Sequence, residues 1–284
     1  CVKRFLETQR NEVVSMSTVT KALAFLSCFS PTRPEIGLSQ LCRLAGRDKA
    51  TTYRHMPALE AAGFVEQNPA TRHYRLGPAV MQLAQVREAT VPRKEGALAA
   101  LAMLARTTGE TAHATVLSGS TLYALTSCES PEHGTRAIVD ISTFPLHATA
   151  SGVCVLAFGP EALFEVAAAN LERFTSATPV TREDLAAVIA AIRETGFGRA
   201  NQSFEAEIHA ISAPVFDHSG PVAGAVSVAS VASRFTPELE HKIKTNLAAA
   251  SREITRNWGG TLPANVEAAW ARSLSQTPAL ESVS

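Results

Sequence analysis

The stretch DKATTYRHMPALEAAGFVEQNPATRHYRL, residues 48–76, decides the fold of the N-terminal part of the chain. Asp48 is a good helix cap, and a helix over residues 49–62 is expected to end at Gly63. Residues 64–67 and 72–76 predict two strands joined by a turn at residues 68–71. Pro57 removes one backbone donor inside the helix and predicts a bend there. The stretch therefore indicates a helix followed by a β-hairpin with a basic tip.

Two shorter helices are predicted before this stretch. Ser17 can cap the first, which Pro31 and Pro34 end, and its apolar positions follow helical spacing at Val19, Ala22, Leu23 and Leu26. Ser39 can cap the second, which Gly46 closes, and its inward positions are Leu41, Leu44 and Ala45. Three helices followed by a basic hairpin is the order of a winged helix-turn-helix domain.

The helix over residues 49–62 has two distinct faces on a helical wheel. Thr52, Met56 and Leu59 point to one side, which is expected to pack on the other helices. The other side carries short and hydrogen-bonding side chains suited to a major groove, and the candidate DNA-binding residues there are Lys49, Ala50, Thr51, Tyr53 and Arg54. Arg72 and His73 at the hairpin tip are expected to reach the DNA backbone or minor groove. The alternative is a small helical domain with an ordinary solvated face, and His55 is expected to be a hydrogen-bonded core or boundary residue.

The 284 residues carry no net charge, but the charges are unevenly distributed. Residues 1–90 contain 12 Lys and Arg against 7 Asp and Glu, whereas residues 91–284 contain 14 against 19. A basic N-terminal third is typical of a module that binds a polyanion, although chance fluctuation accounts for the division about as well. No apolar run is long enough to span a membrane and residues 1–10 do not resemble a signal peptide, so a cytoplasmic protein is expected. Five cysteines without C-x-x-C spacing predict reduced thiols, and no cofactor or metal is expected.

The rest of the chain predicts a connecting helix and a second, α+β domain. Residues 78–89 are expected to form the connecting helix, as a linker and dimer contact or, alternatively, as a helix packed within one domain. Further helices are predicted at 95–108, 181–196 and 236–258, and strands at 112–117, 122–128, 136–140, 208–216 and 221–230. We therefore expect an extension at residues 1–16, the winged helix-turn-helix at 17–77, a linker at 78–91, the second domain at 92–260 and a mobile tail at 261–284.

Over residues 19–259 the sequence resembles the IclR family of bacterial transcriptional regulators. The N-terminal match includes GLSQL at 37–41, DKATTYR at 48–54, LEAAGFVE at 59–66 and YRLGP at 74–78. Two C-terminal stretches are more specific: LHATASG at 146–152, and ISAPVFD at 211–217 leading to VAGAVSV at 222–228. The resemblance implies a GAF-like effector-binding domain at residues 92–260, operator DNA and a small-molecule effector as partners, and a homodimer or dimer of dimers.

The resemblance also implies where an effector binds. The family positions that contact effectors correspond here to Leu146, Ala150, Ser151, Ala200, Ile208, Ala210, Ser227 and Ala229. Residues 147–153 also predict an extended segment that turns into a helix, and its free amides at Ala150, Ser151 and Gly152 would suit a carboxylate. Asn201 is a further polar candidate. Several relatives have an acidic side chain in place of Ala200 and a serine in place of Ala229, so we expect an effector more apolar than a small keto acid, such as an aromatic carboxylate.

Two other classes of function have weaker support. The sequence contains no G-x-S-x-G, H-E-x-x-H, P-loop or G-x-G-x-x-G motif, and Cys154 with His147 is a weak candidate for a nucleophile and base because a buried core cysteine is far more common. Eight His and five Cys lack close ligand spacing, which leaves a thiol- or metal-responsive regulator on the same scaffold as the alternative. We expect a ligand-controlled DNA-binding regulator and no enzyme.

Overall fold

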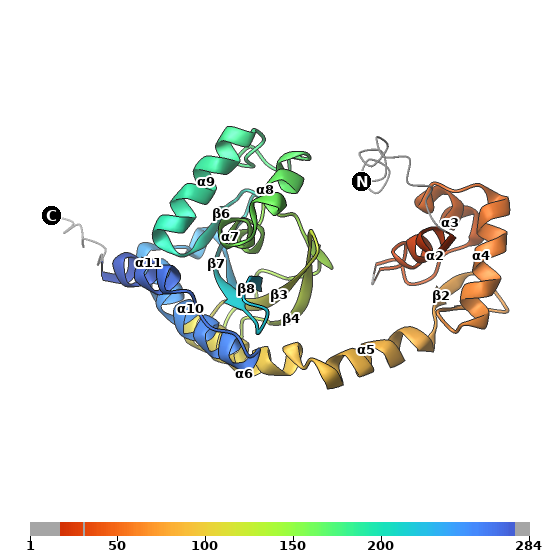
Figure 1. The fold of residues 1–284 in the computed structure, drawn as a ribbon, viewed down its shortest axis with the longest axis horizontal. Coiled ribbons are helices and arrows are strands. Elements are labelled where there is room, and N and C mark those ends of the chain that lie inside the picture. The colour runs from red at the N-terminus through yellow and green to blue at the C-terminus, as the bar shows by residue number, and fades with distance from the viewer. Residues whose placement is uncertain (1–17, 31, 276–284) are drawn as a thin grey trace. The chain divides into compact units, whose positions relative to one another are not determined.

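The chain divides into two compact units, residues 1–91 and 92–284 (Figure 1). The computed structural model describes residues 18–30 and 32–275. The expected extension at 1–16, the Ser17 cap, the stop at Pro31 and residues 276–284 of the expected tail lie outside the described residues. Each unit has its own cluster of buried apolar side chains, so each is described by itself.

The first unit is a winged helix-turn-helix domain followed by one further helix. Its elements are α2 (Thr18–Leu26), α3 (Leu38–Ala45), α4 (Lys49–Ala61), β1 (Val65–Gln67), β2 (Tyr74–Leu76) and α5 (Pro78–Thr90). The two strands pair antiparallel, and a bridge between Ile36 and Tyr74 ties the hairpin to the segment before α3. Phe25, Leu41 and Met56 are fully buried at the centre of its core. The three helices and the hairpin thus enclose one small core.

Helix α4 begins where the sequence predicts it. The Asp48 carboxylate accepts a hydrogen bond from the backbone N–H of Thr51 at 2.7 Å, which satisfies an amide that the first turn leaves without a helical partner. Thr52, Met56 and Leu59 are buried as predicted. Pro57 lies inside α4 and is exposed, so its ring points away from the packed face of the helix.

The two shorter helices differ from the sequence predictions in detail. In α2, Val19 and Leu23 are 65% and 52% exposed, and Phe25 is the buried side chain. Helical spacing predicts which apolar residues of α2 share a face. The face that packs in the core is the adjacent one, which carries the larger Phe25 ring. Ser39 is not the cap of α3, because Gly37 occupies that position and Ser39 lies in the first turn. Gly46 closes α3 in a left-handed conformation with φ of 62°, as expected.

No residue of α5 is buried. Its apolar side chains Met81, Leu83 and Val86 are all more than half exposed. The alternative of a helix packed within its own domain is therefore not what the structure shows. At the junction with the hairpin, a Cβ on Gly77 would collide with the carbonyl oxygen of Gly63, so this close approach of two backbone segments requires glycine.

The second unit is built on a six-stranded antiparallel sheet in the order β5-β4-β3-β8-β7-β6. The strands are β3 (Thr111–Ser118), β4 (Thr121–Cys128), β5 (Thr143–Phe144), β6 (Gly198–Asn201), β7 (Ile208–Phe216) and β8 (Val222–Val231). Helices α6 (Arg93–Thr108) and α10 (Pro237–Asn257) lie side by side along the sheet (Figure 1). Helix α7 (Ala150–Phe158) packs against β6, β7, β8 and α9 (Arg182–Thr195), and α8 (Glu161–Ala168) follows it. The whole chain is thus α+β, as predicted.

The strand expected at residues 136–140 does not form. The backbone there is irregular, and the hydroxyl of Thr111 holds it by donating a hydrogen bond to the carbonyl oxygen of Ala137 at 2.7 Å. The strand on the other side of β4 from β3 is β5, which pairs through Leu122 with Phe144 and Tyr123 with Thr143. The prediction of a strand at residues 136–140 is therefore wrong.

The tail expected from residue 261 contains a further helix, α11 (Ala264–Ser275). Its Trp270 is fully buried, the indole N–H donates to the carbonyl oxygen of Gly196 at 2.8 Å, and the ring stacks on Phe197. The helix therefore belongs to the core of the second unit, and the expectation of a mobile tail from residue 261 is wrong for residues 264–275.

Candidate effector pocket and DNA-binding groove

Polar side chains from α3, α4 and the hairpin surround one groove in the first unit. It is lined by Gly37, Leu38, Ser39, Gln40, Arg43, Lys49, Tyr53, Gln67, Thr71, Arg72, His73 and Tyr74. Arg43, Lys49 and Arg72 are cationic, and this described lining includes no Asp or Glu. We call this feature the cationic groove. Positive charge combined with hydrogen-bonding side chains is what contacts to a nucleic-acid backbone require.

Backbone contacts fix the hairpin beside α3. Ile36 and Tyr74 exchange two backbone hydrogen bonds, at 2.8 and 2.9 Å. The Gln67 side-chain amide donates to the carbonyl oxygen of Arg72 at 2.8 Å, which holds the two arms of the hairpin tip together. A Cβ on Gly37 would lie 3.1 Å from His73 Nε2, so glycine leaves room for this side chain next to α3. The groove is therefore set by the fold and not only by flexible side chains.

Four of the predicted DNA-binding residues line the cationic groove: Lys49, Tyr53, Arg72 and His73. Ala50, Thr51 and Arg54 lie on α4 outside its lining. The Thr51 hydroxyl donates to the Asp48 carboxylate at 2.8 Å, so its donor is already engaged in the helix cap. The other eight lining residues were not predicted, and among them Ser39, Gln40 and Arg43 are polar positions of α3 around the buried Leu41, which is a usable signal for an outward face of this helix.

His55 is buried against the ring of Phe25, with the ring centroids 6.2 Å apart. Its Nε2 has no hydrogen-bond partner among the described residues, so it is a core histidine but not the hydrogen-bonded one that the sequence predicts. Burial lowers the His55 pKa, and the nearby charges of Arg54, Lys21 and Arg47 lower it further. The neutral ring is therefore a packing residue of the first unit.

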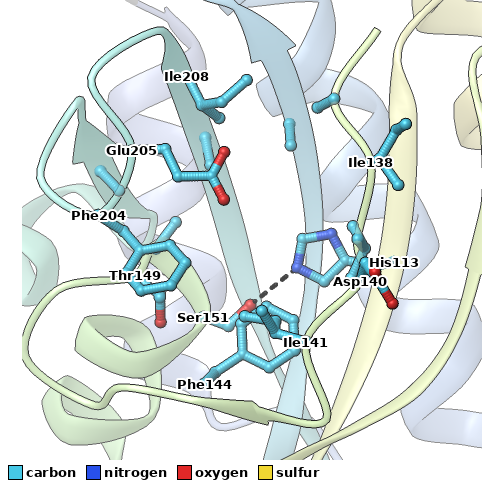
Figure 2. A pocket seen from close by; sticks show the side chains of 16 residues that line it. His113, Ile138, Asp140, Ile141, Phe144, Thr149, Ser151, Phe204, Glu205 and Ile208 are labelled. Carbon is cyan, nitrogen blue, oxygen red and sulfur yellow. Dashed lines mark hydrogen bonds between the residues drawn. The ribbon is translucent and has the colours of Figure 1, made fainter. Parts of the chain in front are cut away.

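In the second unit, a cavity of about 180 Å³ is bordered by the sheet, the start of α7, residues 137–141 and the turn after β6 (Figure 2). Its lining residues are His113, Ala137, Ile138, Val139, Asp140, Ile141, Phe144, Thr149, Ala150, Ser151, Ala200, Phe204, Glu205, Ile208, Ala210 and Ala229. We call it the effector pocket. Its wall is mainly apolar; the charged side chains are Asp140 and Glu205, and the described lining contains no Lys or Arg.

A chain of hydrogen bonds forms one wall of the effector pocket. Ser151 Oγ on α7 lies 2.6 Å from Ser227 Oγ on β8. It also lies 3.3 Å from His113 Nε2 on β3 (Figure 2). Burial lowers the His113 pKa to about 4, so the imidazole is neutral at pH 7. Its ring stacks on Phe144, and its Nδ1 has no hydrogen-bond partner among the described residues. His113 Nδ1 is therefore an uncharged imidazole nitrogen on this wall of the pocket.

The start of α7 has fewer free amides than the sequence predicts. Thr149 caps the helix: its hydroxyl accepts the Gly152 N–H at 3.0 Å and donates to the carbonyl oxygen of Pro145 at 2.9 Å. The Gly152 amide is therefore not free, which corrects the expectation of three available amides. A Cβ on Gly152 would lie 2.5 Å from the carbonyl oxygen of Leu146, so the glycine accommodates the chain's own backbone.

The predicted effector residues separate into two groups. Ala150, Ser151, Ala200, Ile208, Ala210 and Ala229 line the effector pocket. Leu146, Gly152, Asn201 and Ser227 do not; Ser227 reaches it through Ser151, and the Asn201 side chain accepts a hydrogen bond from Arg199 at 2.7 Å. Sequence reasoning missed His113, Phe144, Thr149, Phe204, Glu205 and residues 137–141. His113 lies in a run of buried residues on β3, and no local pattern distinguishes it from the core.

The structure gives no support to Cys154 as a nucleophile. The thiol is fully buried, and burial raises its pKa to about 12, so the reactive thiolate is scarce at neutral pH. His147 Nε2 lies 2.8 Å from the carbonyl oxygen of Glu172. The described cysteines, at positions 28, 42, 128 and 154, are free thiols, and the described part of the chain holds no group of three or more His, Cys, Asp or Glu side chains suited to a metal ion. None of the described helices is long and apolar enough to cross a membrane.

Comparison with known proteins matches both units to one family. Residues 92–256 match the family model "Bacterial transcriptional regulator IclR C-terminal", and residues 18–69 match the "IclR helix-turn-helix domain". The chain belongs to the IclR family. A crystal structure assigned to the IclR transcriptional regulators, from Silicibacter sp. TM1040, is 40% identical with a TM-score of 0.82, over 88% of this chain and 99% of its own. The HTH-type transcriptional regulator XynR of Escherichia coli K12 is 26% identical, over 86% of this chain and 98% of its own.

Membership in the IclR family assigns the general function. The chain is a DNA-binding transcriptional regulator with an N-terminal helix-turn-helix domain and a C-terminal domain that binds a small-molecule effector. The family consists of regulators and not of enzymes, in agreement with the sequence prediction. The cationic groove and the effector pocket therefore lie in the two domains that carry these two activities.

Proposed function

We propose that this IclR-family regulator binds its operator through the cationic groove together with the exposed face of α4. The observation that carries the proposal is the gathering of Arg43, Lys49 and Arg72 around one groove without a carboxylate in its described lining. The exposed residues of α4 (Ala50, Arg54 and, at 62% exposure, Tyr53) would face the bases in the major groove. Arg72 and His73 on the hairpin would contact the neighbouring backbone.

The functional form proposed is a homodimer or a dimer of such dimers. Two recognition helices are needed to read two half-sites about one DNA turn apart. In the first unit, large apolar side chains are exposed on two helices: Val19 and Leu23 on α2, and Met81, Leu83 and Val86 on α5. Exposed apolar residues grouped along helices are typical of a surface that a second copy covers. Such a dimer would bind DNA in the cytoplasm.

The proposed effector is a small, mainly apolar molecule in the effector pocket, which stabilises one of two dimer arrangements and so changes operator affinity. Six residues expected from the family resemblance line this cavity, which supports the choice of site. An IclR homologue from Microbacterium hydrocarbonoxydans, of the same fold but 22% identical with a TM-score of 0.71 over 85% of this chain and 99% of its own, was crystallised with 4-hydroxybenzoate. The carboxylate expected from the sequence remains a prediction.

The test is a titration of the purified chain against the intergenic DNA beside its own reading frame, across a salt series. We expect tight binding that competitor DNA does not displace and that weakens steeply as salt rises. Arg54→Ala should lower operator affinity and leave the dimer, measured by sedimentation, intact. Weak binding that is equal on any duplex, with and without candidate aromatic and keto acids, would contradict the proposal. Unchanged affinity of Arg54→Ala would remove this residue from the DNA contact.

A further inference from the structure

Three alanines from neighbouring strands form one row on the sheet at the effector pocket. Ala200 on β6 pairs with Ala210 on β7, and Ala210 pairs with Ala229 on β8, so the three residues lie side by side across the strands. Residues paired in this way point to the same face of a sheet, and all three line the cavity. Because neighbouring strands are about 4.8 Å apart, the three methyl groups span about 10 Å. We call this feature the alanine row.

The next row on the same face of the sheet is polar, and α7 packs directly on it. This row contains Ser212 on β7 and Ser227 on β8, which pair with each other two residues along from the alanines. The Ser212 hydroxyl donates to the carbonyl oxygen of Ala150 at 2.7 Å. Ser227 Oγ lies 2.6 Å from Ser151 Oγ. The first turn of α7 thus covers the polar row, and the part of the sheet that remains as the floor of the cavity is the alanine row.

Larger groups enclose the alanine row at both ends. Beyond Ala229 the pairing continues to Thr111 on β3, whose hydroxyl holds the wall at residues 137–141. Beyond Ala200 the sheet ends, and the turn after β6 brings Phe204 to the lining (Figure 2). The enclosed cavity has a volume of about 180 Å³. Since an apolar cavity of about 150 Å³ in another protein binds benzene, this pocket has room for one six-membered ring with a small substituent.

An even floor of methyl groups favours a flat ligand. No side chain of the alanine row extends beyond Cβ, so a flat ring can contact all three methyl groups with one face. Dispersion attraction falls steeply with distance, so a puckered ring, which brings only part of its atoms to the contact distance, gains less from the same floor. Ala210 is the middle residue of the row, and a larger side chain there would project beneath the centre of the ring.

We propose that the alanine row selects a ligand built on one flat six-membered ring, and that Ala210 is the residue that determines this shape specificity. The ring lies with its face on the methyl groups and with its polar substituent toward the start of α7. The inference rests on the proposed function, because it names the ligand class of the same pocket. It concerns the shape and the orientation of the ligand, which the expectation of a mainly apolar acid leaves open.

Three acids of the same charge test the shape of the ligand on the full-length chain. Benzoate has one flat ring, cyclohexanecarboxylate has a puckered ring with the same number of carbons, and 2-naphthoate has two flat rings. Calorimetric titration should show benzoate binding about fivefold or more tighter than either of the other two. Equal or tighter binding of cyclohexanecarboxylate or of 2-naphthoate overturns the proposal, and so does the absence of binding by all three up to about 10 mM.

The orientation of the ring can be measured by NMR of a chain whose alanine methyl groups carry carbon-13. Protons above the face of an aromatic ring shift upfield, whereas protons near its plane shift downfield. Benzoate should therefore move the methyl signals of the alanine row upfield. Ala213 is the internal control, because it lies on β7 but is fully buried outside the lining of the pocket. Downfield shifts in the alanine row, or shifts of Ala213 as large as those of the row, overturn the proposed orientation.

Substitutions of Ala210 test its role in specificity. The loss of benzoate affinity should follow the added volume: it should be smallest for Ala210→Ser, about tenfold for Ala210→Val and larger for Ala210→Leu. Ala210 is only half-buried and faces the cavity, so the added groups enter open space, and the unfolding midpoint shows that each variant is folded. Ala124→Leu is the matched control, because Ala124 is exposed on β4 of the same sheet and does not line the pocket. Unchanged benzoate affinity of Ala210→Val, or an equal loss in Ala124→Leu, overturns the role of Ala210.

Operator binding by the same preparations separates this inference from the proposed function. Wild type and Ala124→Leu should bind operator DNA with the same affinity and the same salt dependence, because the change lies outside the first unit. If wild type binds its operator specifically and cyclohexanecarboxylate binds as tightly as benzoate, the shape inference alone fails. If specific operator binding is absent from wild type, with and without the three acids, the proposed function fails whatever their affinities are.

Discussion

The cationic groove and the effector pocket are concave sites of opposite charge in the two units of one chain. Arg43, Lys49 and Arg72 line the first without a carboxylate, and Asp140 and Glu205 line the second without Lys or Arg, as far as the described residues go. A net charge of zero therefore hides two sites whose charged lining residues are of opposite sign. The comparison teaches that the charge of an individual site does not follow from the net charge of the chain.

The largest effect we expect is a loss of stability in the second unit and not in the first. Trp270→Ala removes a fully buried indole and its hydrogen bond to Gly196, and should lower the free energy of unfolding of the second unit by about 3–5 kcal/mol. The first unit has its own core around Phe25 and should keep its unfolding midpoint.

Hydrogen exchange followed by mass spectrometry under increasing urea can read the two units of this variant separately. Trp270→Phe is the control, because it retains a ring against Phe197 and should cost less. Equal destabilisation of both units would show that their cores are not independent and would remove the basis for comparing them as separate sites.

The next effect concerns the neutral wall of the effector pocket. The His113 pKa is lowered to about 4 in the folded state, against an ordinary value near 6.5, so the unfolded chain binds the proton more readily. Stability from this residue is complete above pH 6.5 and is lost as the pH falls toward 4, by about 3 kcal/mol in total. Denaturation of the second unit at pH 7, 6 and 5 should show a shallower pH dependence in His113→Gln than in wild type. Identical slopes would mean that His113 is not buried in its neutral form.

The architecture was largely predictable from the sequence, because caps, glycines and spacing act locally. Such signals are the Asp48 cap, the Gly46 stop and the turn between β3 and β4, and the structure confirms each of them. Helix α11 was missed although its buried residues Val266, Ala269 and Trp270 follow helical spacing. What this spacing does not show is the partner of Trp270, because Gly196 and Phe197 lie more than seventy residues away in sequence.

The lining of the effector pocket was predictable only in part, because it also depends on residues that are far apart in sequence. The alanines and Ser151 follow from the family resemblance, and they do line the cavity. The sequence predicts a strand at residues 136–140, whereas the hydroxyl of Thr111 holds Ala137 and residues 137–141 form a wall of the pocket. Glu205 is an exposed residue of the turn after β6. Its direction toward the cavity (Figure 2) is set by the turn geometry, which sequence alone does not give.

A smaller effect would sharpen the assignment of the cationic groove. Lys49→Ala should weaken operator binding about tenfold and lower the slope of log affinity against log salt by about one, because one phosphate contact is lost. Arg75→Ala is the matched control: Arg75 is a hairpin cation outside the groove lining that pairs with Glu66 at 2.5 Å. Fluorescence anisotropy with labelled operator measures both. The same change of slope in the two variants would mean that the positive charge of the whole first unit, and not the groove in particular, determines DNA binding.

The smallest effect would test whether the Thr149 cap lowers the positive potential at the start of α7. Thr149→Val removes the hydroxyl that occupies the Gly152 amide, which should cost about 1 kcal/mol of stability and expose one N–H at the positive end of the helix. Affinity for benzoate should then rise about threefold, the size of a helix-end interaction with an anion. Thr181→Val is the matched control, since Thr181 caps α9 in the same way, by accepting the Asp184 N–H at 3.1 Å, but does not line the pocket. It should lose similar stability and leave benzoate affinity unchanged. If both variants leave that affinity unchanged, the Thr149 cap does not affect how the pocket binds an anion.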